Sequence, residues 1–259
     1  MKARIWALAV IVILAGASPS LSYLGEVVDS YVSPAETYNG GVGVSNNDIY
    51  VSRRYSPIMI YRCNINNGSV LDSWPPPNNK PAFGVAYVPR GHCWCNRQTE
   101  KIFYCCDYTT GSITRSWTVS NLAYGLAPLC TGDGGAGTTR LLANYINPNR
   151  VCAHNLGDGT VTNTVNLSVC ARWDIAYDWR NNMVWGLNSA GNQINGYSYD
   201  TGSVVASFEA PAPMTKGLAY TGSYLYAASD NSGLIYQIHC PGDIGVAPAS
   251  VGRVKALFF

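Results

Sequence analysis

Short apolar runs recur along the chain from about residue 25 to residue 240, and polar turns separate them. Within the runs, apolar and polar positions alternate, which is the period of a β-strand with one buried face. The segments between them contain turn sequences such as "NNG" at residues 66–68 and "DTG" at residues 200–202. The pattern therefore predicts an all-β chain built from short strands.

The runs themselves repeat in a fixed order. Five similar openings occur: "GVGV" at Gly41, "GVAY" at Gly84, "GLAP" at Gly125, "DIAY" at Asp174 and "GLAY" at Gly217. Their spacings are 43, 41, 49 and 43 residues, and the longest spacing contains an extra loop, "TGDGGAGTT", at residues 131–139. A period of about 40 to 45 residues with several short strands is typical of propeller blades.

Each unit predicts four strands. A small-apolar strand at the opening is followed by a second run at residues 49–52, 141–144, 183–187 and 224–228. A third run follows at residues 58–65, 102–108, 194–200 and 234–239. The fourth begins at a glycine: "GSVLDSW" from Gly68, "GSITRSW" from Gly111, "GTVTNTV" from Gly159 and "GSVVASF" from Gly202.

The last unit has no fourth strand of this kind after residue 240. Its counterpart is near the N-terminus, where "GEVVDSY" from Gly25 matches "GSVVASF" position for position. It begins 16 residues before Gly41, the same offset that separates Gly68 from Gly84. The sequence therefore predicts a five-bladed β-propeller of four-stranded blades. Its N-terminal strand would complete the last blade and close the ring without an open sheet edge.

The first 22 residues are predicted to be a secretory signal peptide. Lys2 and Arg4 precede an apolar run at residues 5–16, and small residues follow up to Ser22. This run is shorter than the roughly 20 residues that span a bilayer, and no later run is long enough. We therefore expect one propeller domain over residues 23–259, with a C-terminal tail from about residue 241. The protein would be exported, as an extracellular or periplasmic protein without a membrane span.

Charge and cysteine content narrow the chemistry. Charged residues make up 12% of the chain and the net charge is +2 without a basic cluster, so no nucleic-acid partner is expected. Nine cysteines in an exported chain predict disulfides, with at least one cysteine unpaired. The densest stretch, residues 92–106, predicts a hairpin with a Cys93–Cys105 disulfide. A zinc site is the alternative, but adjacent Cys105 and Cys106 would point to opposite faces, so no metal or other cofactor is expected.

The blade formula resembles the secreted YVTN-type and streptogramin-lyase-like propeller repeats over residues 25 to 240. It reads G-[LV]-A-Y, then an aromatic strand, I-Y, and G-S-[VI]-[VL]-x-S-[FWY]. The resemblance implies a ligand site at the mouth of the central channel, where the loops entering the innermost strands converge. That superfamily includes enzymes, binding modules and proteins of unknown role, so the resemblance implies no single function.

The residue before each opening would lie at that mouth, and it differs in every blade: Gly40, Phe83, Tyr124, Trp173 and Lys216. Asp174 replaces the glycine of the other openings, and Arg172 is close by in sequence. Aromatic rings with polar anchors would suit a sugar or a planar ligand. The predicted ligand site therefore comprises Phe83, Tyr124, Arg172, Trp173, Asp174 and Lys216. The alternative is that the rings fill the channel and pack between blades.

These features favour a binding or interaction module whose partner is a small molecule, a glycan or a surface protein. A glycoside hydrolase would need two or three acids around the axis, and only Asp174 stands at an innermost strand. A lyase would need a His and Glu arrangement at the mouth, whereas His92, His154 and His239 fall elsewhere in their blades. A third alternative is a structural subunit of a surface assembly. The unpaired cysteine and the apolar "ALFF" ending would support its self-assembly.

Overall fold

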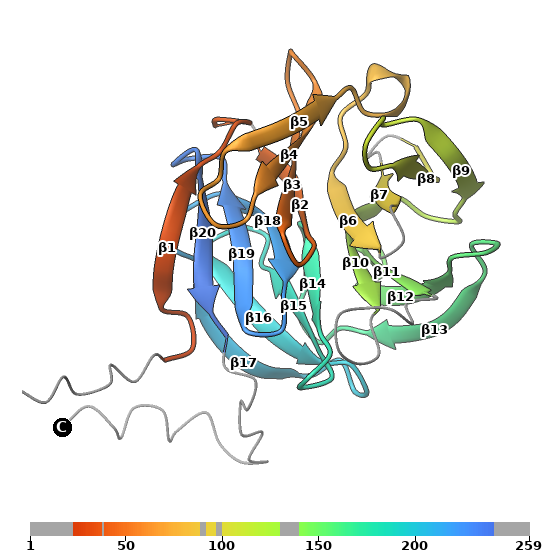
Figure 1. The fold of residues 1–259 in the computed structure, drawn as a ribbon. Coiled ribbons are helices and arrows are strands. Elements are labelled where there is room, and N and C mark those ends of the chain that lie inside the picture. Colours follow the sequence, from red (N-terminus) through yellow and green to blue (C-terminus); the bar gives the residue numbers. More distant parts are fainter. Residues whose placement is uncertain (1–22, 38, 89–91, 97–99, 130–139, 241–259) are drawn as a thin grey trace, which may run out of the picture.

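A computed structural model describes residues 23–37, 39–88, 92–96, 100–129 and 140–240 (Figure 1). For His92 and Cys93 only the backbone is described. The predicted signal peptide at residues 1–22, the loop at residues 131–139 and the tail from residue 241 lie outside the described residues.

Five four-stranded antiparallel sheets surround a central axis, which confirms the predicted five-bladed β-propeller (Figure 1). From the innermost strand outward, blade 1 contains β2 (Asn39–Val44), β3 (Asp48–Arg53), β4 (Met59–Asn64) and β5 (Val70–Trp74). Blade 2 contains β6 (Gly84–Val88), β7 (His92–Asn96), β8 (Ile102–Asp107) and β9 (Ile113–Thr118). Blade 3 contains β10 (Ala123–Leu129), β11 (Arg140–Tyr145), β12 (Arg150–Asn155) and β13 (Val161–Asn166).

Blade 4 contains β14 (Ile175–Asp178), β15 (Met183–Leu187), β16 (Gln193–Ser198) and β17 (Val204–Glu209). Blade 5 contains β18 (Thr215–Tyr220), β19 (Tyr224–Ser229), β20 (Leu234–His239) and β1 (Val27–Val32). A short 3-10 helix, η1 (Pro77–Asn79), connects blades 1 and 2. Over the described ranges, no helix is long and apolar enough to cross a membrane.

Strand β1 completes blade 5, as the repeat predicts. It pairs antiparallel with β20, with Ser30 opposite Tyr236. Beside this ladder, the His239 N–H donates to the Glu26 carbonyl oxygen at 2.7 Å. One sheet therefore joins the two ends of the described chain, and this pairing closes the ring.

A glycine and an aromatic ring connect the outer strands of neighbouring blades. The glycine before each outer strand has a positive φ: Gly25, Gly68, Gly111, Gly159 and Gly202. A Cβ on Gly111 would lie 2.2 Å from Cδ1 of Trp74 in the preceding blade, and one on Gly68 would lie 2.6 Å from Cβ of Tyr31. Glycine is thus required both for the left-handed backbone and for the close approach of the preceding blade. This double requirement explains the repeated G-S-V-x-x-S-aromatic pattern.

The hydrophobic core lies between the blades. Successive side chains of an innermost strand point to opposite blade interfaces. Leu126 packs in a cluster with Trp94 and Trp117 of blade 2, whereas Ala127 packs in the next cluster with Ile175 of blade 4. Because these side chains point into the interfaces between blades, the backbones of the innermost strands line the channel.

The register of blade 2 corrects the predicted disulfide. In β7 and β8, Cys93 lies opposite Cys106 and Trp94 lies opposite Cys105. Cys93 and Cys105 therefore belong to opposite faces of the sheet and do not form the predicted bond. Cys105 carries a free, buried thiol, and burial raises its pKa. Free thiols in the described part of the chain also include Cys63, Cys106, Cys152, Cys170 and Cys240.

His154 is a buried packing residue of blade 3. Its Nδ1 lies 3.0 Å from the Gly159 carbonyl oxygen and its Nε2 lies 2.8 Å from the Tyr145 hydroxyl. A carbonyl only accepts, so Nδ1 carries the proton and Nε2 accepts from Tyr145. Burial lowers the pKa of His154, and the Gly159 carbonyl acts against this shift. The imidazole is therefore held neutral in the folded protein.

Gly111→Ala is expected to destabilise the protein by about 2–5 kcal/mol, from the left-handed backbone and the overlap with Trp74. Urea unfolding measures the change, and Ser112→Ala at the adjacent exposed residue is the control. If both variants unfold at the wild-type urea concentration, the contact between Gly111 and Trp74 does not require a glycine.

Stability is expected to fall as the pH drops below about 6.5, the ordinary pKa of histidine. In that range unfolded His154 binds a proton, whereas folded His154 stays neutral until the pH passes its lowered pKa. Urea unfolding between pH 7.5 and 5 would measure this slope in the wild type and in His154→Gln. The variant should show a shallower slope, and an unchanged slope would assign the effect to another group.

Candidate ligand site at the open end of the channel

The carboxylate of Asp174 occupies the propeller axis. Its side chain is buried, and its Oδ2 accepts hydrogen bonds from the N–H groups of Val42 at 2.9 Å and Leu218 at 3.3 Å. Its Oδ1 accepts from the N–H groups of Leu126 and Ile175, each at 3.1 Å. One side chain therefore links the innermost strands of blades 5, 1 and 3 to the start of β14 in its own blade.

Glycine at the other openings makes room for this arrangement. A Cβ on Gly125 would lie 2.5 Å from Oδ1 of Asp174, and one on Gly41 would lie 2.5 Å from the Val85 nitrogen. A Cβ on Gly217 would lie 2.4 Å from Cγ2 of Val42. The axis thus has space for one side chain, and blade 4 supplies it.

Burial raises the pKa of the Asp174 carboxyl well above its usual range, while the four N–H donors act in the opposite direction. All four donors point to carboxyl oxygens, so each oxygen serves as an acceptor. This saturation leaves the group poorly suited to contact a ligand. Asp174 acts as a structural link between blades.

The residues predicted as the ligand site do gather at one end of the channel, but they leave little space. Their hollow is too narrow for a water-sized sphere, and its lining consists of Gly40, Arg54, Phe83, Tyr124, Trp173, Asp174 and Lys216. Arg172 does not line it, and its guanidinium lies 5.6 Å from the Trp173 ring centroid. The predicted residues therefore close this end of the channel, which we call the closed end.

An ion cluster holds the closed end together. Nη2 of Arg54 lies 2.5 Å from Oδ2 of Asp230, and the Lys216 ammonium donates to the same oxygen. The Lys216 ammonium also lies 5.0 Å from the Trp173 ring centroid, and the Arg54 guanidinium lies 5.4 Å from the Phe83 centroid. Burial lowers the pKa of Lys216, the hydrogen bond to Asp230 opposes that shift and neighbouring Arg54 adds to it. The sequence placed Lys216 correctly at the axis, but its ammonium is engaged by Asp230.

The opposite end of the channel contains a cavity of about 710 Å³. It lies where the chain leaves the innermost strands, and exposed Asn46, Asn47 and Thr221 stand at its opening. Its inner part is lined by the residue after each opening, Val42, Val85, Leu126, Ile175 and Leu218. Four of these residues donate their N–H to Asp174, so that carboxylate separates the cavity from the closed end. We call this cavity the open-end cavity.

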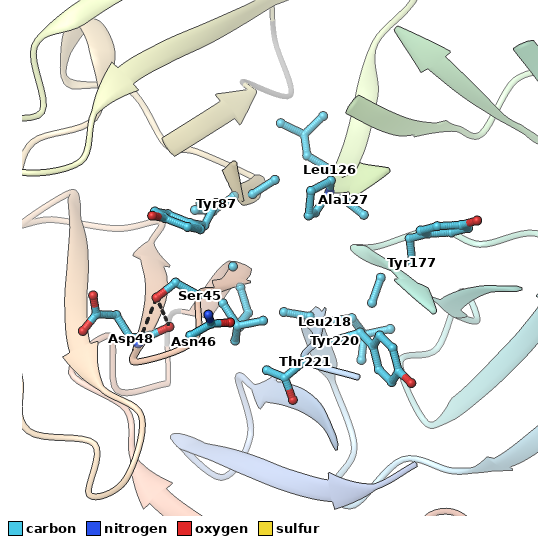
Figure 2. A pocket seen from close by; sticks show the side chains of 18 of the residues that line it. Ser45, Asn46, Asp48, Tyr87, Leu126, Ala127, Tyr177, Leu218, Tyr220 and Thr221 are labelled. Carbon is cyan, nitrogen blue, oxygen red and sulfur yellow. Dashed lines mark hydrogen bonds between the residues drawn. The ribbon is translucent and has the colours of Figure 1, made fainter. Parts of the chain in front are cut away.

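Aromatic side chains surround the open-end cavity. The fourth position of the openings supplies Tyr87, Tyr177 and Tyr220, and Figure 2 shows these rings around the cavity with their hydroxyls directed away from its centre. The Tyr177 hydroxyl donates to Oδ1 of Asn182 at 2.9 Å, and that of Tyr220 donates to the Gly222 carbonyl at 2.9 Å. Burial raises the pKa of Tyr177 to about 12. These hydrogen bonds hold the Tyr177 and Tyr220 rings in position.

Two arginines extend the aromatic walls. The Arg62 guanidinium lies 5.2 Å from the Tyr108 ring centroid and donates to Oδ2 of Asp48 at 2.9 Å. The Arg180 guanidinium lies 5.0 Å from the Trp179 centroid. Both cations therefore lie against an aromatic ring that also lines the cavity.

Polar groups on the β2–β3 turn complete the lining. The Ser45 hydroxyl accepts from the Asp48 N–H at 3.0 Å, which holds the turn that carries Asn46 and Asn47 (Figure 2). Over the described residues, no three His, Cys, Asp or Glu side chains are grouped closely enough to hold a metal ion. The chemistry available at the open end is therefore aromatic contact combined with amide, hydroxyl and guanidinium hydrogen bonding.

The sequence contained a signal for these residues. The tyrosine at the fourth position of the G-[LV]-A-Y opening lines the cavity. Because this tyrosine recurs in several blades, the sequence suggested a structural role for it. Trp179, Arg180 and Arg62 belong to turns and a third strand, and nothing in their spacing placed them together.

The fold defines the class of protein: a closed five-bladed propeller with one filled and one open channel end. The chain matches no protein family and no curated protein. Its fold is similar to that of the Myxococcus xanthus glutaminyl cyclase, with a TM-score of 0.65, 11% identity and coverage of 83% of this chain and 95% of that one. It is also similar to the Cps50 (Swd1) β-propeller domain of Myceliophteria thermophila, with a TM-score of 0.55, 9% identity and coverage of 83% and 99%. At these identities the likeness concerns the fold alone.

Asp174→Asn is expected to lower the free energy of unfolding by about 2–6 kcal/mol. An amide keeps one acceptor oxygen, so two buried N–H groups lose their partner at roughly 1–3 kcal/mol each. Urea unfolding measures the effect, with Asp200→Asn in an exposed turn as the matched control. Equal stability of the two variants would show that the axial hydrogen bonds do not hold the blades together.

Proposed function

We propose that this propeller is an exported binding protein whose ligand is a hydroxyl-rich small molecule or glycan held in the open-end cavity. The observation that carries the proposal is the volume of about 710 Å³. Small-molecule sites usually measure about 300–1,000 Å³ and combine apolar or aromatic walls with a few polar groups. The cavity has this size and composition.

The charges around the cavity favour a neutral ligand. Arg62 is hydrogen-bonded to Asp48. The backbone N–H of Arg180 donates to the buried carboxylate of Asp178 at 3.0 Å. Each of the two arginines therefore has a carboxylate near its own residue. Hydroxyl groups can use such donors and acceptors without bringing a charge of their own.

Binding is favoured over catalysis by the shortage of reactive groups. Asp48 is the one carboxylate among the described residues that line the cavity, and Arg62 occupies it. Glycoside hydrolysis by the usual route needs a pair of carboxyl groups on either side of the scissile bond. The name of the glutaminyl cyclase describes that enzyme, and its likeness to this chain supports the propeller fold only.

A screen of glycans and neutral small molecules, followed by calorimetry, would test the proposal. Trp179→Ala should weaken binding about tenfold, because a large aromatic contact and the support of Arg180 are lost together. Trp173→Ala at the closed end is the comparison and should retain the wild-type affinity. A loss confined to Trp173→Ala would place the ligand at the closed end, and a screen without any binder would contradict the proposal.

A further inference from the structure

The outer strands share a five-residue pattern in which the third position varies. Each strand begins with an exposed Val or Ile and continues to Ser or Thr at the fourth position, and each contains a register shift next to the third. In the order β1, β5, β9, β13 and β17, the third residue is Asp29, Asp72, Arg115, Asn163 and Ala206. These strands form the outer edges of the five blades, where backbone groups are open to pairing with another strand.

In three blades, the third residue caps the edge. Oδ1 of Asp29 accepts from the N–H of Ser30 at 2.7 Å, and Oδ1 of Asp72 accepts from the N–H of Ser73 at 2.7 Å. In blade 3, Oδ1 of Asn163 accepts from the next N–H at 2.9 Å. Each cap gives the N–H of the following residue a side-chain partner, so this donor is less available to an added strand in β1, β5 and β13.

The other two blades differ from each other. In β9, Arg115 donates to the carbonyl oxygens of Leu156 and Gly157 in blade 3, at 2.9 and 3.2 Å, and places a charge on the edge. In β17, the methyl group of Ala206 can neither cap the following N–H nor repel a strand. Among the described outer strands, β17 is therefore the one with neither a cap nor a charge at this position.

The first residues of β17 are also apolar. Val204 is 38% exposed and Val205 is 40% exposed, on consecutive positions. An added strand would cover this surface and would use the free edge groups, and apolar side chains with main-chain hydrogen bonds are the two contributions that strand addition requires. The edge therefore fits an extended, apolar segment.

We propose that the C-terminal segment of the same chain, residues 251–259, pairs with the edge of β17 as a fifth strand of blade 4. The described chain ends at Cys240, which belongs to the same packed cluster as Ala206 and Phe208 of blade 4. The ten residues 241–250 can span up to about 33 Å, enough to reach a neighbouring edge.

The composition of the segment fits this edge. Its sequence, "VGRVKALFF", contains β-branched and aromatic residues and no acids. Its two cations, Arg253 and Lys255, complement the exposed Glu209 at the end of β17. The first residues of β1 and β5 are equally apolar and exposed. The other four edges differ from β17 in the Asp, Arg or Asn that they present where β17 presents Ala206.

Limited trypsin digestion of the full chain tests the pairing, because cleavage after Arg253 and Lys255 requires the segment to be unpaired. Ala206→Asp should speed this cleavage about tenfold. It introduces a residue that β1 and β5 already carry at the same position, so the propeller should keep its melting temperature. Ala206→Val, which adds no cap or charge, is the matched control and should remain slow. Val251→Pro tests the same pairing from the segment itself, leaves both trypsin sites intact and should also speed cleavage.

Three outcomes would overturn the proposal. Cleavage in the wild type that is as fast as in Ala206→Asp would show that the segment does not pair with β17. Protection that rises with protein concentration would assign the edge to a second copy of the chain. Protection that survives both Ala206→Asp and Val251→Pro would place the segment elsewhere on the molecule.

Discussion

Five strand edges meet at the axis of this propeller, and the rest of the structure depends on how their buried N–H groups are satisfied. Each innermost strand pairs within its blade on one side only, so its other edge faces the channel. Buried N–H groups without partners would cost about 1–3 kcal/mol each. Asp174 accepts four of them, and it fits because Gly125 leaves space next to its Oδ1.

The same carboxylate divides the channel into two unequal parts. On one side, the ion cluster of Arg54, Asp230 and Lys216 and three aromatic rings complete the seal. On the other side, the third position of every opening is a glycine or an alanine, and space remains. The position of the open-end cavity is therefore a consequence of how the blades are held together. A change at the axis would alter both the stability of the ring and the floor of the cavity.

The repeat was sufficient to predict the fold because spacing, strand order and the closure strand follow from periodicity alone. The closed-end residues were also predicted as a group, since they occupy one position of the repeat. Their role was not predictable, because whether Trp173 and Tyr124 line a site or fill the axis depends on distances between blades that no spacing records. The predicted Cys93–Cys105 disulfide is wrong because Cys93 lies opposite Cys106, the next residue. A difference of one position in strand register exchanges the two faces of the sheet.

Departures from the repeat carry the information that the repeat itself lacks. A position kept in every blade, such as the glycine that precedes each outer strand and packs against the preceding blade, reflects what all blades need in order to pack. Blade 4 departs at both of its ends: Asp174 stands where the other blades have glycine, and Ala206 stands where they have a polar or charged residue. The inner departure fills the axis, which only one blade can do. The outer departure leaves the edge of β17 without a cap or a charge, so blade 4 differs from the other blades at both its innermost and its outermost strand.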